Sequence, residues 1–248
     1  MHLSLFHIGL ITGTFILAGG VKGVTGMGLP TVAIGLLGLS MSPAEAAAFL
    51  VIPSLVTNLW QYLAGPHRLL LLRRMWPMLG TTAIATWAAS GAIAGAEANR
   101  ASFYLGLALV AYAALGLSKI RMSVGMRHQI WLSPVVGAAT GVVTGATGVL
   151  VIPAVPYLQA LDFDRDDLVQ VLGLSFTVST LALALGLASH GAFNAGSVAA
   201  SALSTAPALL GMLAGQAIRP RINPATFRLL FFVGLLMFGG DLAGHAML

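Results

Sequence analysis

Residues 19–30 read GGVKGVTGMGLP, and they place Lys22 among five glycines in a long apolar stretch that carries no other charge. The stretch at 141–148, GVVTGATG, repeats the pattern in the second half of the chain. When the two stretches are laid over each other, identical residues coincide at Gly19 and Gly141, Val21 and Val143, Gly23 and Gly145, Thr25 and Thr147, and Gly26 and Gly148. Self-similarity at a fixed offset indicates a repeated unit. We therefore expect one domain made of two repeats, residues 1–124 and 125–248.

The composition is that of an integral membrane protein. Hydrophobic residues make up 58% of the chain and charged residues 8%, and the mean hydropathy is +0.93. Such a chain cannot cover a water-soluble surface of ordinary polarity. Apolar stretches, most of them close to the ~20 residues that span a membrane, lie at 5–39, 45–64, 76–95, 101–118, 130–161, 168–189, 196–218 and 225–243. The sequence predicts an all-α polytopic membrane protein.

The two glycine-bearing stretches, 5–39 and 130–161, are unusual in length. As continuous helices they would be too long for one upright crossing of a ~30 Å hydrocarbon core and too short for two. A re-entrant segment that enters the membrane, turns at its glycines and leaves on the same side fits this length better. A single tilted span is the alternative.

The basic residues in the loops favour the re-entrant arrangement. Single crossings would spread these bases almost evenly over the two sides of the membrane. Re-entrant segments would invert the halves, with three transmembrane helices beside the broken segment in each, and would leave Arg100 alone on one side. The bases on the other side would be Arg68, Arg73, Arg74, Lys119, Arg121, Arg127, Arg165, Arg219, Arg221 and Arg228. Because cytoplasmic loops carry an excess of Lys and Arg, we expect two inverted repeats.

Inverted repeats with broken helices that meet near the middle of the membrane are a common design of secondary transporters. Irregular backbone at membrane depth is tolerated where it is buried or lines a cavity. The helices that follow the glycine turns begin near Pro30 and Val149, and a helix N-terminus offers free N–H donors and partial positive charge to an anion. We therefore expect a midplane anion site at the two turns.

The candidate substrate-binding residues combine one charge, flexible backbone and polar side chains. Lys22 would neutralise the anion, the glycines would present backbone N–H groups, and the hydroxyl and amide side chains would donate hydrogen bonds. Several come from two polar clusters within apolar helices, 51–61 and 173–183, which align at the same offset as the turns. The full set is Lys22, Thr25, Gly26, Gly28, Asn58, Gln61, Thr144, Thr147, Gly148 and Ser175.

Each of these features also has a purely structural interpretation. The spacings Gly19-x3-Gly23 and Gly141-x3-Gly145 are typical of closely packed membrane helices. Lys22 would extend to an interface if it lay near a membrane surface. Polar side chains inside membrane helices commonly form hydrogen bonds between helices.

Two acidic motifs are better interpreted as helix starts than as sites. SPAE at 42–45 and DRDD at 164–167 each place a capping side chain three residues before an acid. This is the pattern of a capped helix N-terminus, so we expect helices to begin just after Ser42 and Asp164.

The sequence offers no catalytic constellation. The chain contains no cysteine, which excludes thiolate metal sites, iron–sulfur clusters and disulfides. It contains no nucleophile elbow, no P-loop, no histidine pair with metal-ligand spacing and no paired acids within an apolar span. We expect a protein that is not an enzyme and that needs no cofactor or metal. The excess of basic residues lies in loops between spans, so we expect no nucleic-acid partner.

The segments GGVKGVTGMGLPTVAIGLLGL (19–39) and GVVTGATGVLVIPAVPYL (141–158), with PSLVTNLWQ (53–61), resemble the TauE/SafE sulfite-exporter family, also called the sulfonate permease superfamily. The resemblance covers essentially the whole chain. It implies a multi-pass protein of the bacterial inner membrane that moves sulfur-containing anions such as sulfite or an organosulfonate.

The leading functional hypothesis is therefore a secondary transporter, acting as an exporter of a small sulfur-containing anion. An anion channel with a continuous pore and a membrane subunit that does not transport alone are the alternatives. The expected partners are the anionic substrate and membrane lipid. The sequence does not indicate the oligomeric state.

Overall fold

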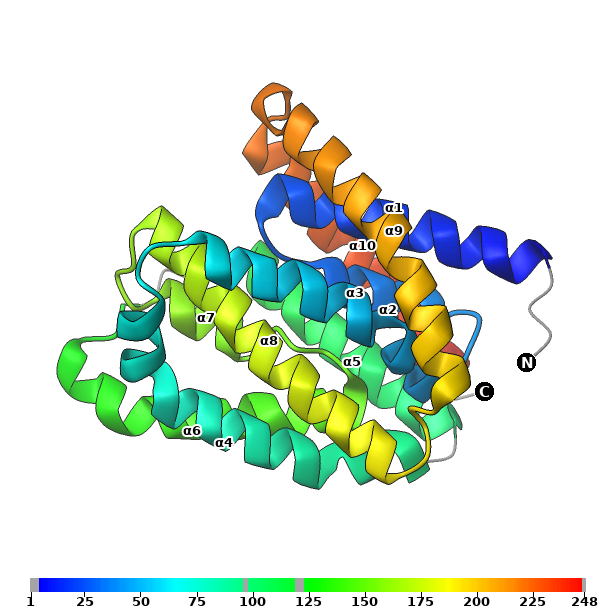
Figure 1. Ribbon diagram of the computed structural model, residues 1–248, viewed down its shortest axis with the longest axis horizontal. Coiled ribbons are helices and arrows are strands. Elements are labelled where there is room, and N and C mark those ends of the chain that lie inside the picture. The colour runs from blue at the N-terminus through cyan, green and yellow to red at the C-terminus, as the bar shows by residue number, and fades with distance from the viewer. Residues whose placement is uncertain (1–4, 96–97, 119–122, 247–248) are drawn as a thin grey trace.

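The computed structural model describes residues 5–95, 98–118 and 123–246, and the chain is helical along almost all of this length (Figure 1). No β-strand occurs in these three ranges. In chain order the helices are α1 (Leu5–Thr25), α2 (Leu29–Leu37), α3 (Pro43–Ala64), α4 (Arg68–Gly95), α5 (Ala98–Leu117), α6 (Met126–Thr147), α7 (Ala154–Gln159), α8 (Arg165–Ser189), α9 (Ala195–Ile218) and α10 (Pro224–His245), with a 3-10 turn at Arg219–Arg221.

The chain is a multi-pass membrane protein. Within the described ranges, seven helices are long and apolar enough to cross a membrane, namely α1, α3, α5, α6, α8, α9 and α10. Their outward faces carry exposed leucine, isoleucine and tryptophan side chains, which suit contact with lipid. Helices α2 and α7 contain 9 and 6 residues and are too short to cross.

The two halves repeat the same order of helices, since α1 to α5 and α6 to α10 each run as a long helix, a short helix and three long helices. The main packing contacts follow this repeat. Helix α1 packs on α9 as α6 packs on α4, and α3 contacts α9 as α8 contacts α4. The pairs α3 with α8 and α5 with α10 join equivalent helices.

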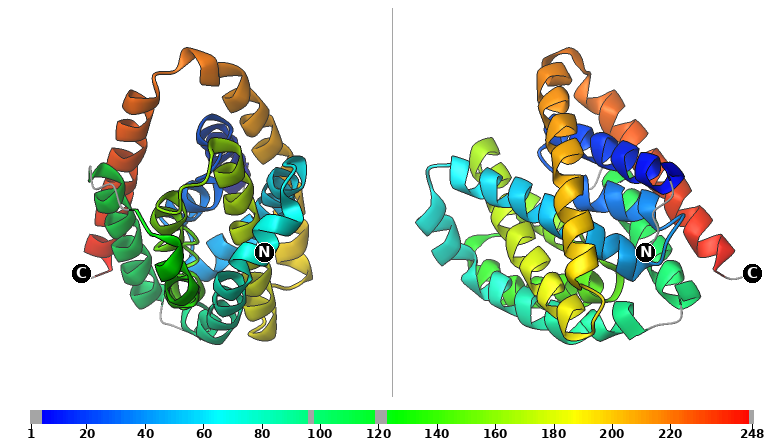
Figure 2. Two further views of the ribbon diagram at one scale, coloured as in Figure 1. Left: turned by 90° about the vertical axis from the view of Figure 1, so that its left-hand side faces the viewer. Right: turned by 45° about the vertical axis from the view of Figure 1, so that its right-hand side comes forward.

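In Figure 2, α9 and α10 meet at a loop that projects away from the other helices. The boundary after residue 124 and the inversion across the membrane stay predictions.

Each glycine-bearing stretch is broken at its glycines. The first becomes α1, with 21 residues, and α2, with 9 residues, and the second becomes α6, with 22 residues, and α7, with 6 residues. Figure 1 shows the chain reversing its direction between α1 and α2. The first helix of each pair, α1 or α6, is long enough to cross a membrane, and the helix that follows the turn, α2 or α7, is short.

The small-x3-small glycines pack helices together. A Cβ atom on Gly19 or Gly23 would collide with the backbone of α9, and one on Gly141 or Gly145 would collide with the backbone of α4. The helices therefore approach more closely than any larger residue allows, as this spacing permits in membranes. Packing is the observed role of these four glycines, which precede the glycines of the turns themselves.

Both predicted helix starts are confirmed. The Ser42 hydroxyl accepts from the backbone N–H of Glu45, whose carboxylate accepts from the Ser42 N–H in return, and α3 begins at the next residue, Pro43. Asp164 accepts from the N–H of Asp167 at 2.7 Å, and α8 begins at Arg165. These caps fix where the helices that carry the two polar clusters begin.

Helix α3 contains a proline break that α9 bridges. Pro53 has no N–H to donate to the carbonyl of Phe49, four residues earlier. The hydroxyl of Ser201 on α9 donates to that carbonyl at 2.8 Å and accepts from the N–H of Ile52 at 3.0 Å. Ser201 is buried, so a side chain of the second half satisfies the backbone of the first at the centre of α3.

Candidate functional site

The first glycine turn joins α1 to α2 through two left-handed residues. The N–H of Gly26 donates to the carbonyl of Lys22 at 2.7 Å and closes α1. Gly26 has φ 81° and Gly28 has φ 98°, which residues with a Cβ atom rarely adopt. The glycines therefore allow the sharp reversal after Thr25.

The second glycine turn begins in the same way. The N–H of Gly148 donates to the carbonyl of Thr144 at 2.7 Å, and Gly148 has φ 73°. The chain then continues without regular structure through residues 149–151 and enters α7 at Ala154. The second turn has a single left-handed glycine, where the first has two.

The threonines before the two turns hold them in the same manner. The Thr25 hydroxyl lies within hydrogen-bond distance of the carbonyls of Val21 (2.9 Å) and Met27 (2.6 Å) and accepts from the N–H of Met27 (3.2 Å). The Thr147 hydroxyl donates to the carbonyl four residues earlier at 2.7 Å and accepts from the N–H two residues later at 3.2 Å. Both hydroxyls are thus engaged with the local backbone.

Lys22 lies in the last turn of α1 and is buried, with 3% of its surface exposed. Its ammonium group donates to the side-chain oxygen of Asn58 on α3. Lys22 is the only charged side chain that is buried in the part of the chain that the structure describes. A charged group in a membrane interior requires a partner or a cavity, and the partner here is a neutral amide.

Asn58 and Ser54 place two unpaired polar atoms beside each other on α3. The side-chain nitrogen of Asn58 and the hydroxyl of Ser54 are fully buried and have no hydrogen-bond partner among the described residues. The two residues are four positions apart and therefore lie on the same face of the helix. Burying polar groups without partners is unfavourable, so a ligand or water that reached these atoms would satisfy them.

Other buried polar atoms lack partners as well. They are the hydroxyls of Thr31 on α2, Thr86 on α4, and Ser175 and Ser179 on α8. Ser175 belongs to the predicted set, whereas Thr31 and Thr86 were not singled out by sequence reasoning. A hydroxyl within an apolar helix gives no sign in the sequence of whether the fold leaves it unpaired.

Gln61 joins two helices. Its side-chain N–H group donates to the carbonyl of Val169 on α8 at 2.6 Å. Thr144 forms only a local bond, donating to the carbonyl of Val149 at 3.1 Å. The bond of Gln61 is thus of the interhelical kind that the structural interpretation predicts, whereas the bond of Thr144 stays within its own turn.

The two glycine turns lie at opposite ends of the antiparallel pair α3 and α8. The first turn approaches Val169, since a Cβ atom on Gly26 would lie 3.6 Å from that side chain, and Val169 bonds to Gln61 near the end of α3. The second turn approaches Ala47 near the start of α3, 3.5 Å from a Cβ atom on Gly148. At a rise of 1.5 Å per residue, these levels are about 20 Å apart along α3.

The structure therefore brings some predicted residues together and separates others. The ammonium group of Lys22 meets the amide of Asn58, and the first turn follows directly. Thr147 and Gly148 lie at the far level of α3. The turns contact opposite ends of α3 and α8, and the midplane anion site at the two turns stays a prediction.

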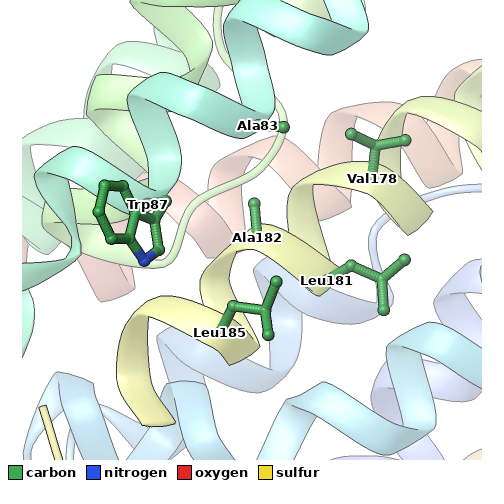
Figure 3. Close-up of a pocket in the computed structure, with 6 residues that line it drawn as sticks. All are labelled: Ala83, Trp87, Val178, Leu181, Ala182 and Leu185. Carbon is green, nitrogen blue, oxygen red and sulfur yellow. The ribbon is translucent and has the colours of Figure 1, made fainter. Parts of the chain in front are cut away.

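Two surface hollows lie away from the predicted residues. The first, about 280 Å³, lies between α4 and α8 (Figure 3). It is lined by Ala83, Trp87, Val178, Leu181, Ala182 and Leu185, whose apolar side chains suit a lipid chain. The second, about 260 Å³, is lined by Gly38, Leu39, Ser102, Asp241, Leu242, His245 and Ala246. Lys22, Ser54 and Asn58 line neither hollow, and all three are buried in this conformation.

A contact between an imidazole and a carboxylate joins the loop after α3 to α8 at the end near the first turn. The Nδ1 atom of His67, in the loop after α3, lies 2.7 Å from the carboxylate of Asp167. The hydrogen bond to Asp167 raises the pKa of the His67 imidazole above its ordinary value. Gln170 adds to the tie, since it accepts from the backbone of His67 (3.2 Å) and donates to the carbonyl of Tyr62 (2.9 Å). Sequence reasoning missed this contact, which depends on how two distant loops meet.

Comparison with known proteins gives one match. The family model described as Sulfite exporter TauE/SafE matches residues 11–242. Neither the curated proteins nor the solved structures give a match to the chain.

Proposed function

This chain belongs to the TauE/SafE family of sulfite exporters, and from this premise we propose that it is a secondary transporter that exports a small sulfur-containing anion. Sulfite and organosulfonates are the proposed substrates, and the bacterial inner membrane is the proposed location. The protein transports and does not catalyse a chemical reaction on its cargo.

One observation carries the proposal. Lys22 is a buried ammonium group whose partner is the neutral side chain of Asn58. An anion beside Lys22 would supply the counter-charge that the buried lysine lacks and would offset part of the unfavourable burial. The side-chain nitrogen of Asn58 and the hydroxyl of Ser54 are unpaired and would donate to the oxygens of the same anion.

The two turns have different parts in this mechanism. Gly26 and Gly28, with Thr25, shape the end of α1 that holds Lys22 against α3. The residues of the second turn, with Thr144, Thr147 and Gly148, would border the path of the anion at the other end of α3. Ser175, whose hydroxyl is unpaired, would lie along the path from the α8 side. Transport would open the two ends in alternation around Lys22.

The inverted arrangement of the repeats forms part of the proposal. The turns lie at opposite ends of α3 and α8, and the main helix contacts persist when the halves are exchanged. Both observations support two halves of opposite orientation, as in many secondary transporters. If the halves are inverted, nearly all Lys and Arg residues of the loops lie on one side of the membrane. Because cytoplasmic loops are rich in Lys and Arg, this supports a cytoplasmic position for the loop between α3 and α4.

The test is transport by the purified chain in liposomes. Sulfite loaded on one side should leave only from vesicles that contain the protein, and unlabelled sulfite on the far side should drive counterflow of labelled sulfite. Replacing Asn58 by Leu should abolish both. The matched control is Thr57→Val, because the Thr57 hydroxyl already donates to the carbonyl of Pro53 at 2.8 Å, and this variant should transport normally.

The other results have distinct meanings. Sulfite flux without counterflow would identify a channel. Absence of flux from folded protein would refute transport by this chain alone and favour a subunit that needs a partner. Normal flux in Asn58→Leu would move the anion site away from α3.

A further inference from the structure

We infer that the site around Lys22 selects singly charged anions, such as a sulfonate or hydrogen sulfite, over doubly charged anions such as sulfate. The inference rests on the proposed function and specifies the charge of the substrate. It follows from the charges and donors that the described part of the chain buries around α1 and α3.

The first step concerns charge. Lys22 is the single buried charged side chain among the residues that the structure describes, and no buried carboxylate accompanies it. One negative charge beside Lys22 gives a neutral pair, whereas two leave a net negative charge in a membrane interior, where an uncompensated charge is strongly unfavourable.

The second step considers other sources of positive charge in this part of the fold. The start of α2 follows the first turn directly, but a helix N-terminus contributes only about half a charge. His67 lies in a loop and its imidazole is bonded to Asp167. The side chain of Arg74 bonds to Gln129 at 3.0 Å. None of these supplies a second full positive charge at the site.

The third step concerns the donors. The unpaired nitrogen of Asn58 and the unpaired hydroxyl of Ser54 lie one helical turn apart on one face of α3, and the oxygen of Asn58 contacts Lys22. A sulfonate group presents three equivalent oxygens and a single charge. It can therefore accept from the lysine, the amide and the hydroxyl without bringing a second charge into the membrane.

Methanesulfonate and sulfate are suitable probes, because they carry one and two charges and neither changes its charge near neutral pH. Each would be titrated into the purified protein in detergent, at ionic strength matched with gluconate, while thermal unfolding is followed. The same anions would compete for sulfite flux in liposomes. Methanesulfonate should stabilise the protein and inhibit flux at concentrations at least about tenfold lower than sulfate.

Two variants test the role of charge. Lys22→Met should lose the response to methanesulfonate. Asn58→Asp keeps the size of the side chain and gives Lys22 a carboxylate partner, so the anion-free variant should unfold at a higher temperature and also lose the response. Because Asn58→Asp is expected to fold at least as well as the unmodified chain, it keeps the test decisive if Lys22→Met fails to fold.

The failures are distinguishable. If sulfate acts as strongly as methanesulfonate and both depend on Lys22, the selection by charge is refuted and the proposed transport stands. If neither anion acts and the protein moves no sulfite, both the inference and the proposed function are refuted. A full response to methanesulfonate in Asn58→Asp would also overturn the inference.

Discussion

The two glycine turns are built alike and carry different chemistry. In each turn a threonine hydroxyl bonds to the carbonyl four residues earlier and to the N–H two residues later, and a left-handed glycine follows. They differ at Lys22 of the first turn, where the second has Thr144. The two turns thus share one pattern of backbone hydrogen bonds, while the first alone carries a buried charge among the described residues.

The partners of these residues extend the difference. Lys22 reaches across to Asn58 on another helix, whereas Thr144 donates to its own turn, at the carbonyl of Val149. Thr180, which occupies in the second half the position of Asn58, donates to the carbonyl of Phe176 within its own helix. Thr144 and Thr180 therefore satisfy their own backbone, whereas Lys22 and Asn58 bond to each other and leave the nitrogen of Asn58 unpaired. The two turns therefore share a shape and differ in the polar contacts that their equivalent residues make.

The largest effect should come from removing the charge of the first turn. Lys22→Met should reduce sulfite flux in liposomes by about 100-fold, because the bound anion would lose its proposed counter-charge, and truncating one partner of a buried, hydrogen-bonded charge pair costs about 2–5 kcal/mol. Thr144→Val, at the equivalent position of the second turn, should leave flux within about twofold of normal, since it removes one local hydrogen bond.

An exchange of the two residues tests the comparison further. The double variant Lys22→Thr with Thr144→Lys moves the charge to the second turn, where Thr180 stands in place of Asn58. It should remain inactive, because the new lysine meets no amide at that position. Recovery of flux in the double variant, or loss of flux in Thr144→Val, would show that the two halves are functionally equivalent.

The second effect concerns the glycines of the turns. An alanine at Gly26 or Gly148 must adopt a left-handed conformation, at about 1–2 kcal/mol. At Gly148 the new Cβ atom would also collide with the side chain of Ile34, whereas at Gly26 it would reach Val169 at an ordinary 3.6 Å. Gly148→Ala should therefore be less stable than Gly26→Ala by about 1 kcal/mol, or about 2–4 °C in unfolding temperature. Equal unfolding temperatures would contradict the tighter packing of the second turn.

Much of the local structure was predictable because local patterns determine it. The helix starts after Ser42 and Asp164 follow from capping residues and the acids that accompany them, and the breaks after Thr25 and Thr147 follow from glycine and threonine at fixed positions.

The relation between the helices was not predictable in the same way. The sequence shows two similar turns, but the level of each turn along α3 depends on contacts with Val169 and Ala47 from distant parts of the chain. The bridge from Ser201 to the proline break in α3 likewise joins residues that no local pattern connects. For this reason the sequence indicated where the chain turns but not which end of α3 each turn contacts.

A smaller and symmetrical effect is expected at the threonines. Thr25→Val and Thr147→Val keep the shape of the side chain and remove equivalent hydrogen bonds, so each should lower the free energy of unfolding by about 1 kcal/mol. Thermal unfolding of the two purified variants measures this directly. A loss of stability in only one of the two variants would show that the threonine hydrogen bonds contribute differently to the two turns.

The smallest effect concerns the end of α3 and α8 near the first turn, where His67 contacts Asp167. At the other end of α3 and α8, the equivalent positions hold Ser189 and Glu45. Glu45 bonds to Ser42, so the equivalent positions there hold no histidine–carboxylate contact. The hydrogen bond to Asp167, with the nearby charge of that carboxylate, raises the pKa of His67 in the folded protein.

The sign of the pH dependence follows from this direction. A folded pKa above the unfolded value means that the folded state binds the proton more tightly, so the contact stabilises fully below about pH 6.5 and this contribution is lost as pH rises through the raised pKa. The difference in unfolding temperature between the unmodified chain and His67→Gln should therefore be larger at about pH 6 than at about pH 8.5. It should remain small and shrink with salt, because the imidazole is exposed to solvent. A difference that grows with pH would mean that neutral His67 makes the stabilising contact, and the tie would then not depend on charge.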